Sequence, residues 1–471
     1  MNLKKLFGDR GFWTTSIRLA IPIALQSLLT SSFHLVDTMM VSRLGDVTLS
    51  AVGMAGQWSW LFNLVLQGLC AGLSVFVAQY WGVRNMKGIR ASVGLGFLTG
   101  LAASIGFQTV ALLAPRWVVG LFNQDPQVLE IGVRYLKIIC WTYPAVLLTN
   151  LLSTALRNTE QVQLPMFVSF FTTIANALLN YGLIFGKLGM PELGVEGAAI
   201  ASCISAWAGP VLIVIFSIRA RNALAGPVWE LFAFDRKLVK EFYIKAFPVI
   251  LNQTLWAIGI LNINRIFGNM GYEYYAGITV YKTFGDMTYA FFGGMGNACV
   301  IMVGKSVGQG KIRRTVEDAI RFTILIPLSG LLIGGILILL RHPLVAIFAA
   351  GDNLSALTLQ TAVGVTVVCG LEVAFRNIPY TQVVGVFRAG GDTLAPMFFD
   401  LGCLWLVALP SAWLCANVFH LPFLAVVAAA YLGEDLPKAI CCLIHFRSKK
   451  WIKPVTPEGR AGLEEYLQRS N

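Results

Sequence analysis

Residues 47–83 read VTLSAVGMAGQWSWLFNLVLQGLCAGLSVFVAQYWGV, a run of 37 residues without one Asp, Glu, Lys or Arg. A helix needs about 20 apolar residues to cross the hydrocarbon core of a bilayer, so this run is long enough to span a membrane. Further charge-free runs lie at 19–36, 91–115, 138–156, 161–186, 197–218, 246–264, 287–304, 322–340, 353–371 and 401–433. The pattern predicts an all-α polytopic membrane protein.

The composition of the whole chain agrees with this prediction. Of its 471 residues, 13% are charged and 56% are apolar, whereas a soluble domain has about 25% charged residues. The net charge of +12 does not indicate a nucleic-acid partner, because the basic residues cluster between apolar stretches and form no long basic-aromatic face. The nine cysteines contain no CxxC pair and the four histidines are scattered, so we expect no metal site and no cofactor.

The chain is expected to form twelve transmembrane helices. They are predicted near 13–42, 51–81, 92–114, 135–156, 164–186, 196–218, 246–268, 277–304, 319–340, 358–387, 394–418 and 422–445. Segments on the side of the two termini carry 25 Lys and Arg residues, and the opposite loops carry seven. Because positive residues favour the inner side of a membrane, we expect a multi-pass protein of the plasma membrane with both termini in the cytoplasm.

The sequence also contains an internal repeat. A shift of 226 residues aligns Pro22 with Pro248, Gly45 with Gly271 and Gly82 with Gly308 without a gap. Six helices in each half give the two halves the same topology, so the repeat is parallel and has its axis along the membrane normal. The predicted parts are an N-terminal six-helix bundle at 1–218, a cytoplasmic linker at 219–245, a C-terminal six-helix bundle at 246–446 and a cytoplasmic tail at 447–471. Two bundles facing one cavity indicate a transporter.

Asp37 is the main candidate for chemistry within the membrane. Ionisable groups at this depth are costly and usually face a cavity or a partner. The nearest basic residue in its helix, Arg43, lies almost two turns away. Asn176, Asn180 and Ser202 are expected at the same depth, so a carboxylate, two amides and a hydroxyl could form one site. Hard cations prefer such oxygen ligands, and a carboxylate removed from water also binds a proton readily. A hydrogen-bonded network that only joins the helices is the alternative.

Other polar residues in the membrane have two interpretations each. Glu372 with Arg376, and Glu434 with Lys438, are spaced by four residues and can pair along one helix, either structurally or for transport. His34, three residues before Asp37, is a candidate proton relay. Pro22 removes a backbone hydrogen bond and is a candidate hinge in the first helix.

Several segments together resemble the multidrug and toxic compound extrusion (MATE) family. They are VDTMMVSRLG (36–45), LSAVGMAGQ (49–57), GLSVFVAQYWG (72–82), LNYGLIFG (179–186), LGVEGAAIAS (193–202), GNACVIMVGKSVGQG (296–310) and FRAGGDT (387–393). The resemblance covers both halves and implies two bundles of six helices that open alternately outward and inward. It also implies export of cationic, amphipathic compounds in exchange for Na⁺ or H⁺.

The resemblance also implies roles for single residues. Asp37 matches the acid of the family's first helix, and Asn176, Asn180 and Ser202 match positions proposed to complete an N-terminal cation site. Many relatives carry Glu at the position of Gln253, and some carry Asp near Asn377. Both are amides here, which shifts the expected coupling to the N-terminal bundle. The candidates for the lining of a substrate cavity are Gln26, Gln57, Tyr143, Gln253, Trp256, Asp286 and Asn377.

The sequence therefore predicts a cation-coupled antiporter, expected to be a monomer in the lipid bilayer with small cationic molecules as substrates. A lipid-linked oligosaccharide flippase of a related branch is the alternative, and it would need a cavity ringed by Arg, for which only Arg265 and Arg376 are candidates. An enzyme is not expected, because the chain contains no HExxH, GxSxG or paired-His motif.

Overall fold

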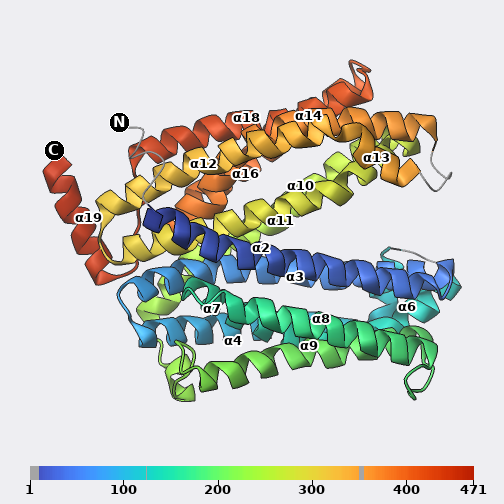
Figure 1. The fold of residues 1–471 in the computed structure, drawn as a ribbon, viewed down its shortest axis with the longest axis horizontal. Helices are drawn as coiled ribbons and strands as arrows, with labels where there is room; N and C mark the ends of the chain where they lie inside the picture. The colour runs from blue at the N-terminus through green and yellow to red at the C-terminus, as the bar shows by residue number, and fades with distance from the viewer. Residues whose placement is uncertain (1–9, 123–124, 350–354, 471) are drawn as a thin grey trace. The chain divides into compact units, whose positions relative to one another are not determined.

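The computed structural model describes residues 10–122, 125–349 and 355–470, and it is helical almost throughout (Figure 1). The first half forms α2 (Arg10–Ser42), α3 (Asp46–Gly82), α4 (Met86–Leu113), α5 (Pro115–Gly120), α6 (Pro126–Ile139), η1 (Cys140–Thr142), α7 (Tyr143–Asn158), α8 (Gln163–Phe185), α9 (Gly194–Arg219) and η2 (Val228–Phe232). The second half forms α10 (Arg236–Met270), α11 (Tyr272–Gly308), α12 (Ile312–Leu339), α13 (Arg341–Ala349), α14 (Ala356–Tyr380), η3 (Thr381–Phe387), α15 (Arg388–Gly390), α16 (Leu394–Cys403), η4 (Leu404–Ala408), α17 (Leu409–Asn417), α18 (Phe423–Ser448) and α19 (Pro457–Ser470).

All twelve predicted long helices are present. Three of them are composite: α6–η1–α7, α14–η3–α15 and α16–η4–α17 each form one continuous helical segment. Among the described residues, eleven helical segments are long and apolar enough to cross a membrane. The twelfth, α18, carries Glu434, Asp435 and Lys438 and is not among the eleven. Over the described ranges the chain therefore has an all-α membrane fold with twelve long helices in two sets of six.

Local sequence signals explain where helices end. Asp125 caps α6, because its carboxylate Oδ1 accepts a 2.8 Å hydrogen bond from the backbone N–H of Gln127. Gly186 ends α8 in the left-handed region with φ +64°, which suits a residue without a Cβ atom. The π-helical segment η3 begins two residues after Pro379, which lacks the backbone N–H needed for regular α-helical bonding.

Several predicted helix boundaries differ from the structure. The helix expected from residue 246 begins ten residues earlier, at Arg236, because its polar first turns continue the helix beyond the apolar run. Within the predicted tail at 447–471, the structure contains α19. Trp451 of this tail is fully buried and stacks on Phe446 with the ring centroids 5.8 Å apart.

The chain divides into two compact units. The N-terminal unit contains Leu25–Val77 and Arg84–Ala246, and the C-terminal unit contains Ala78–Val83, the described residues from Phe247 on, and α2 as far as Ala24. This grouping differs from the sequence-based division, because the first turns of α2 and the last turn of α3 belong to the C-terminal unit. The boundary within α2 lies two residues after Pro22.

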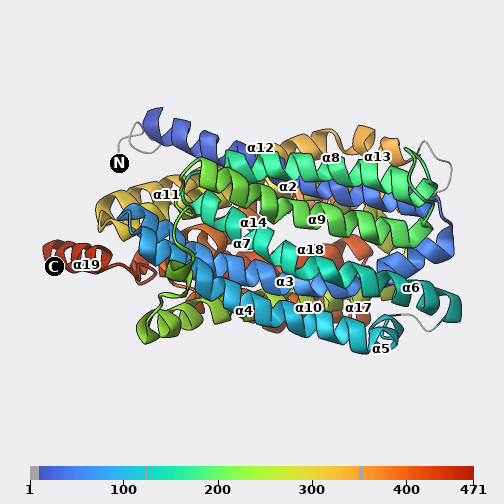
Figure 2. The same ribbon diagram turned by 90° about the horizontal axis from the view of Figure 1, so that it is seen from below.

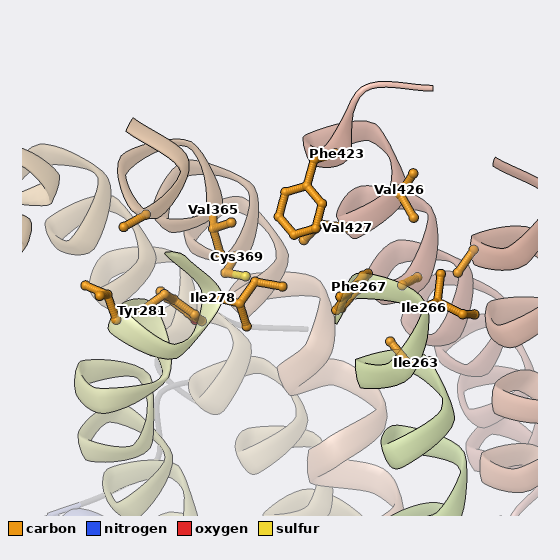
Figure 3. Packing of buried hydrophobic residues seen from close by; sticks show 14 of the residues in the cluster. Ile263, Ile266, Phe267, Ile278, Tyr281, Val365, Cys369, Phe423, Val426 and Val427 are labelled. Carbon is orange, nitrogen blue, oxygen red and sulfur yellow. The ribbon is translucent and has the colours of Figure 1, made fainter. Parts of the chain in front are cut away.

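Apolar side chains form the core of the C-terminal unit. Ile263 and Phe267 of α10 pack with Ile278 of α11, Val365 of α14 and Phe423 of α18 (Figure 3). Phe267 and Ile278 are fully buried, and the rings of Phe267 and Phe423 meet edge to face at 5.8 Å. The apolar faces of four helices thus fix this part of the bundle by burial of hydrophobic surface.

Candidate functional site

A continuous chain of polar side chains joins three helices of the N-terminal unit. Asn180 Nδ2 of α8 donates hydrogen bonds to Asp37 Oδ1 of α2, at 2.8 Å, and to Asn176 Oδ1, at 2.9 Å. Asn176 Nδ2 in turn donates to Ser205 Oγ at 3.1 Å and to Ser202 Oγ at 3.4 Å, both on α9. The structure therefore brings together Asp37, Asn176, Asn180 and Ser202, as equal depth in the helices predicts, while their role stays a prediction.

One oxygen in this network has no hydrogen-bond donor. Asn180 is fully buried, and both hydrogens of its amide nitrogen point at Asp37 and Asn176. Its carbonyl oxygen Oδ1 is buried without a hydrogen-bond partner among the described residues. An unsatisfied buried acceptor costs about 1–3 kcal/mol, so this position favours a bound cation or a polarised water beside the Asp37 carboxylate.

The sequence of α8 explains why its two asparagines point inward. Asn176 and Asn180 are one turn apart and almost completely buried, whereas Phe171, Leu178 and Tyr181 on the remaining surface are exposed. This is the reverse of a soluble amphipathic helix, because the apolar face is the outer one.

The helices α8 and α9 lie side by side (Figures 1 and 2). Gly197 of α9 permits a close approach, because a Cβ atom there would collide with the backbone carbonyl of Leu183 in α8. This close packing places the α9 serines beside the α8 asparagines.

Ser205 is a member of the network that the sequence did not single out. It is buried and lies about one turn beyond Ser202, on the same face of α9. Helical spacing from Ser202 is the signal that could have found it.

A second polar cluster lies in the C-terminal unit. Lys438 Nζ of α18 lies 2.7 Å from Glu434 Oε1, 2.9 Å from Asp400 Oδ1 and 3.4 Å from Asp435 Oδ1. The pairing expected within α18 is therefore present, but Lys438 also reaches Asp400 on α16. Asn252 Nδ2 of α10 donates to the other oxygen of Asp400, at 2.9 Å. Sequence spacing showed the contacts within one helix and missed those between helices.

The residues described by the structure contain no group of three or more His, Cys, Asp or Glu side chains arranged to hold a metal ion. The nine cysteines are all free thiols, and six of them are buried.

The model of the MatE family matches residues 22–182 and 248–414. These two segments make up most of the chain, and they begin at Pro22 and Pro248, the pair aligned by the internal repeat. The chain belongs to the MATE family. It is accordingly a membrane transporter and not an enzyme.

Curated MATE relatives match along nearly the whole chain. The "Probable multidrug resistance protein NorM" of Thermotoga maritima is 27% identical over 450 residues, which cover 93% of this chain and 92% of that protein. The "Multidrug resistance protein MdtK" of Proteus mirabilis is 25% identical over 458 residues, covering 94% of this chain and 96% of that protein.

Solved MATE structures share the fold. The Vibrio cholerae transporter VcmN in its bent form superposes with a TM-score of 0.83 at 17% identity, covering 94% of this chain and 99% of that one. A transporter of the MOP superfamily from Pyrococcus furiosus, described as having a binding pocket of reverse polarity, also shares the fold. Its TM-score is 0.81 at 16% identity, covering 94% of this chain and 96% of that one.

Three candidates for the cavity of this MATE protein lie in the N-terminal unit. Gln57 is exposed. Gln26 is half-buried: its Nε2 donates to Ser169 Oγ at 3.1 Å, and its Oε1 accepts a hydrogen bond from Arg157 Nη1 at 3.4 Å. Tyr143 is 1% exposed and its hydroxyl lies 3.1 Å from Ser59 Oγ, so in this structure it is part of the bundle core.

The other four cavity candidates lie in the C-terminal unit. Asp286 is exposed and Gln253 is half-buried. Trp256 donates its indole N–H to Glu434 Oε1 at 3.1 Å, and Asn377 is buried with Nδ2 donating to the Val373 carbonyl at 2.7 Å. These two side chains therefore have structural partners in their own unit.

The hinge and relay candidates both lie on α2. Pro22 is within the helix, which continues without interruption from Arg10 to Ser42. The side chain of His34 lies outside the described part of the chain. Both roles stay predictions.

Proposed function

We propose that this protein is a secondary active antiporter that exports cationic, amphipathic compounds in exchange for Na⁺ or H⁺ by alternating access. The observation that carries the proposal is the hydrogen bond between the half-buried Asp37 and the buried Asn180, whose carbonyl oxygen has no hydrogen-bond partner among the described residues. The curated relatives are named multidrug resistance proteins, which supports several structurally different substrates. The transporter acts in the plasma membrane as a monomer, with both termini in the cytoplasm, and needs no cofactor apart from the coupling ion.

Asp37 supplies the coupling in this proposal. A ligand shifts the balance of two conformations only by its different affinity for them. Binding of H⁺ or Na⁺ at Asp37 from outside neutralises a carboxylate that is held by Asn180, and this change favours bending of α2 near Pro22. The bound compound is then released outward, and loss of the cation to the cytoplasm resets the transporter.

No observation favours the flippase alternative. Two arginines are candidates for a phosphate-binding ring. Arg265 is exposed, and Arg376 contacts an aromatic ring. The Arg376 guanidinium carbon lies 5.3 Å from the centre of the Tyr289 ring.

Counterflow in proteoliposomes tests the proposed function. The purified protein is reconstituted with a fluorescent cationic dye, and a Na⁺ gradient and a pH gradient are imposed separately. We expect one of the two gradients to drive dye movement against its concentration. Dye movement that responds to neither gradient would contradict ion exchange.

A further inference from the structure

Buried charged groups gather at one place in the C-terminal unit. Glu434, Asp435 and Lys438 of α18 are each less than a tenth exposed, and the Asp400 side chain of α16 is 13% exposed. Desolvated charges of this kind are stable only when they are paired and hydrogen-bonded. The contacts around Lys438 meet this requirement.

The Lys438 ammonium lies close to three carboxylates. Its nitrogen has oxygen neighbours on Glu434, Asp400 and Asp435 at 2.7, 2.9 and 3.4 Å. It donates hydrogen bonds to Glu434 Oε1 and Asp400 Oδ1, and the charge of Asp435 is its third ionic neighbour. A point charge surrounded by carboxylate oxygens from two helices has the arrangement of a monovalent cation in an oxygen site.

Neutral donors also bind two of the carboxylates. Trp256 Nε1 donates to Glu434 Oε1 at 3.1 Å, and Asn252 Nδ2 donates to Asp400 Oδ2 at 2.9 Å. The carbonyl oxygen of Asn252 is buried and has no hydrogen-bond partner among the described residues. Asn252 therefore places one more unused oxygen at the edge of the cluster, where a cation or its water could bind it.

We propose that Lys438 is a built-in cation that occupies the acidic site of the C-terminal unit in place of a soluble coupling ion. With the ammonium at the centre, a Na⁺ ion would meet a like charge in a poorly solvated position, which disfavours its binding. Because this role builds on the proposed coupling at Asp37, it further implies that a single cation, bound in the N-terminal unit, serves each transport cycle.

The internal repeat agrees with different roles for the two units. At the constant offset of 226 residues, the counterpart of Asp37 is Ile263. Ile263 is 1% exposed and lies in the apolar core of the C-terminal unit (Figure 3). The second half therefore has no acid at the equivalent position, and the carboxylates around Lys438 lie instead on α16 and α18.

Binding of ²²Na⁺ to the purified full-length protein tests the inference. All variants carry Asp37→Asn, which removes the N-terminal carboxylate, and binding is measured at pH 8. We expect no saturable Na⁺ binding by the Asp37→Asn protein. Adding Lys438→Ala should create about one saturable Na⁺ site per chain, because the carboxylates lose their internal cation. Lys438→Gln, which keeps more of the side-chain volume, should do the same and serves if the alanine variant does not fold.

Two controls separate the site from a general effect of charge. Lys438→Arg retains the positive charge and should create no site. Lys282→Ala removes another lysine of this unit, whose Nζ donates to Asn264 Oδ1 at 3.1 Å, and should also create none. Saturable Na⁺ binding to the Asp37→Asn protein with Lys438 intact would overturn the inference, as would its absence from both neutral Lys438 variants in folded protein. Neither result depends on whether export is coupled at Asp37.

Discussion

Asn180 joins Asp37 to α8 and, through Asn176, to α9. Its amide nitrogen contacts both the carboxylate and Asn176, so it fixes where the negative charge lies. A hydrogen bond to a charged group stabilises a protein by about 1.5–3 kcal/mol. Removing the donor costs more than this if the acceptor is left buried without a partner. The cation affinity of this site should therefore depend on Asn180 almost as strongly as on the acid.

Replacing Asn180 by Leu should raise the half-saturating concentration of the coupling ion about tenfold or more, since a charged hydrogen bond of about 1.5–3 kcal/mol is lost. The measurement is gradient-driven dye export as a function of ion concentration. Ser205→Ala is the matched control. This variant should change the half-saturating ion concentration by less than about threefold, because Asn176 retains Ser202 as a hydrogen-bond partner. If the Asn180→Leu protein has the same half-saturating ion concentration as the unmodified protein, Asn180 does not take part in ion binding.

The amides of the C-terminal unit should matter less. We predict that Gln253→Ala and Asn377→Ala each reduce export less than Asp37→Asn does, because an amide carries no proton and binds cations more weakly than a carboxylate. Initial export rates are compared at equal expression. If either alanine variant is as inactive as the Asp37 variant, the C-terminal unit carries the coupling.

At the scale of elements, the helix α2 contains both Asp37 and a proline, Pro22, which removes one backbone hydrogen bond. Pro22 lies two residues before the boundary between the two compact units, and Asp37 lies four turns further along. A proline within a helix costs about 3 kcal/mol because it removes a donor and clashes with the preceding turn. Such a helix bends at lower cost there than elsewhere.

Pro22→Ala should slow export several-fold while leaving ion binding intact, because a regular helix resists bending. Initial export rate and equilibrium ion binding are the two measurements. Pro327→Ala, at a proline within α12, is the control and should leave the export rate near that of the unmodified protein. A Pro22 variant that exports at the normal rate would exclude the hinge.

The segment before α19 attaches the end of the chain to the C-terminal unit. Trp451 donates its indole N–H to the Phe446 carbonyl at 3.2 Å, and the backbone N–H of Val455 donates to Gln79 Oε1 at 2.7 Å. Thr456 Oγ1 donates to the Gly308 carbonyl, also at 2.7 Å. These contacts join the end of the chain to the last turn of α3 and to α11.

Trp451→Ala should lower the free energy of unfolding by about 3–5 kcal/mol, the usual cost of removing a buried aromatic side chain. The midpoint of thermal unfolding in detergent measures the effect. Trp229→Ala is the control, because Trp229 is 74% exposed, and it should leave the midpoint nearly unchanged. Equal midpoints for the two variants would show that the end of the chain does not stabilise the unit.

Much of the whole molecule could be predicted from the sequence, because charge-free runs and the 226-residue repeat are properties of the chain alone. Counting residues from the helix ends also placed Asp37 and Asn180 at the same depth in the membrane. Rotation about the helix axes could not be predicted, so the contact of Lys438 with Asp400 and the position of Asn252 became visible only in the structure. The early start of α10 was missed because hydropathy marks apolar runs and not helix ends.

In the whole molecule, the two halves share a fold but differ in the polarity of equivalent positions. The same family model matches both halves, yet Asp37 lies in a polar network of the N-terminal unit and its counterpart Ile263 lies in an apolar core. We therefore expect ion exchange to take place in the N-terminal unit, with Asp37 as its central residue.

Gradient-driven dye export by Asp37→Asn protein in proteoliposomes tests this assignment most directly. The variant and the unmodified protein are reconstituted at equal density, after size-exclusion chromatography has shown that both are folded. The account predicts that the unmodified protein moves dye against its concentration under the coupling gradient and that the Asp37→Asn protein does not. Undiminished gradient-driven export by the variant would contradict the account.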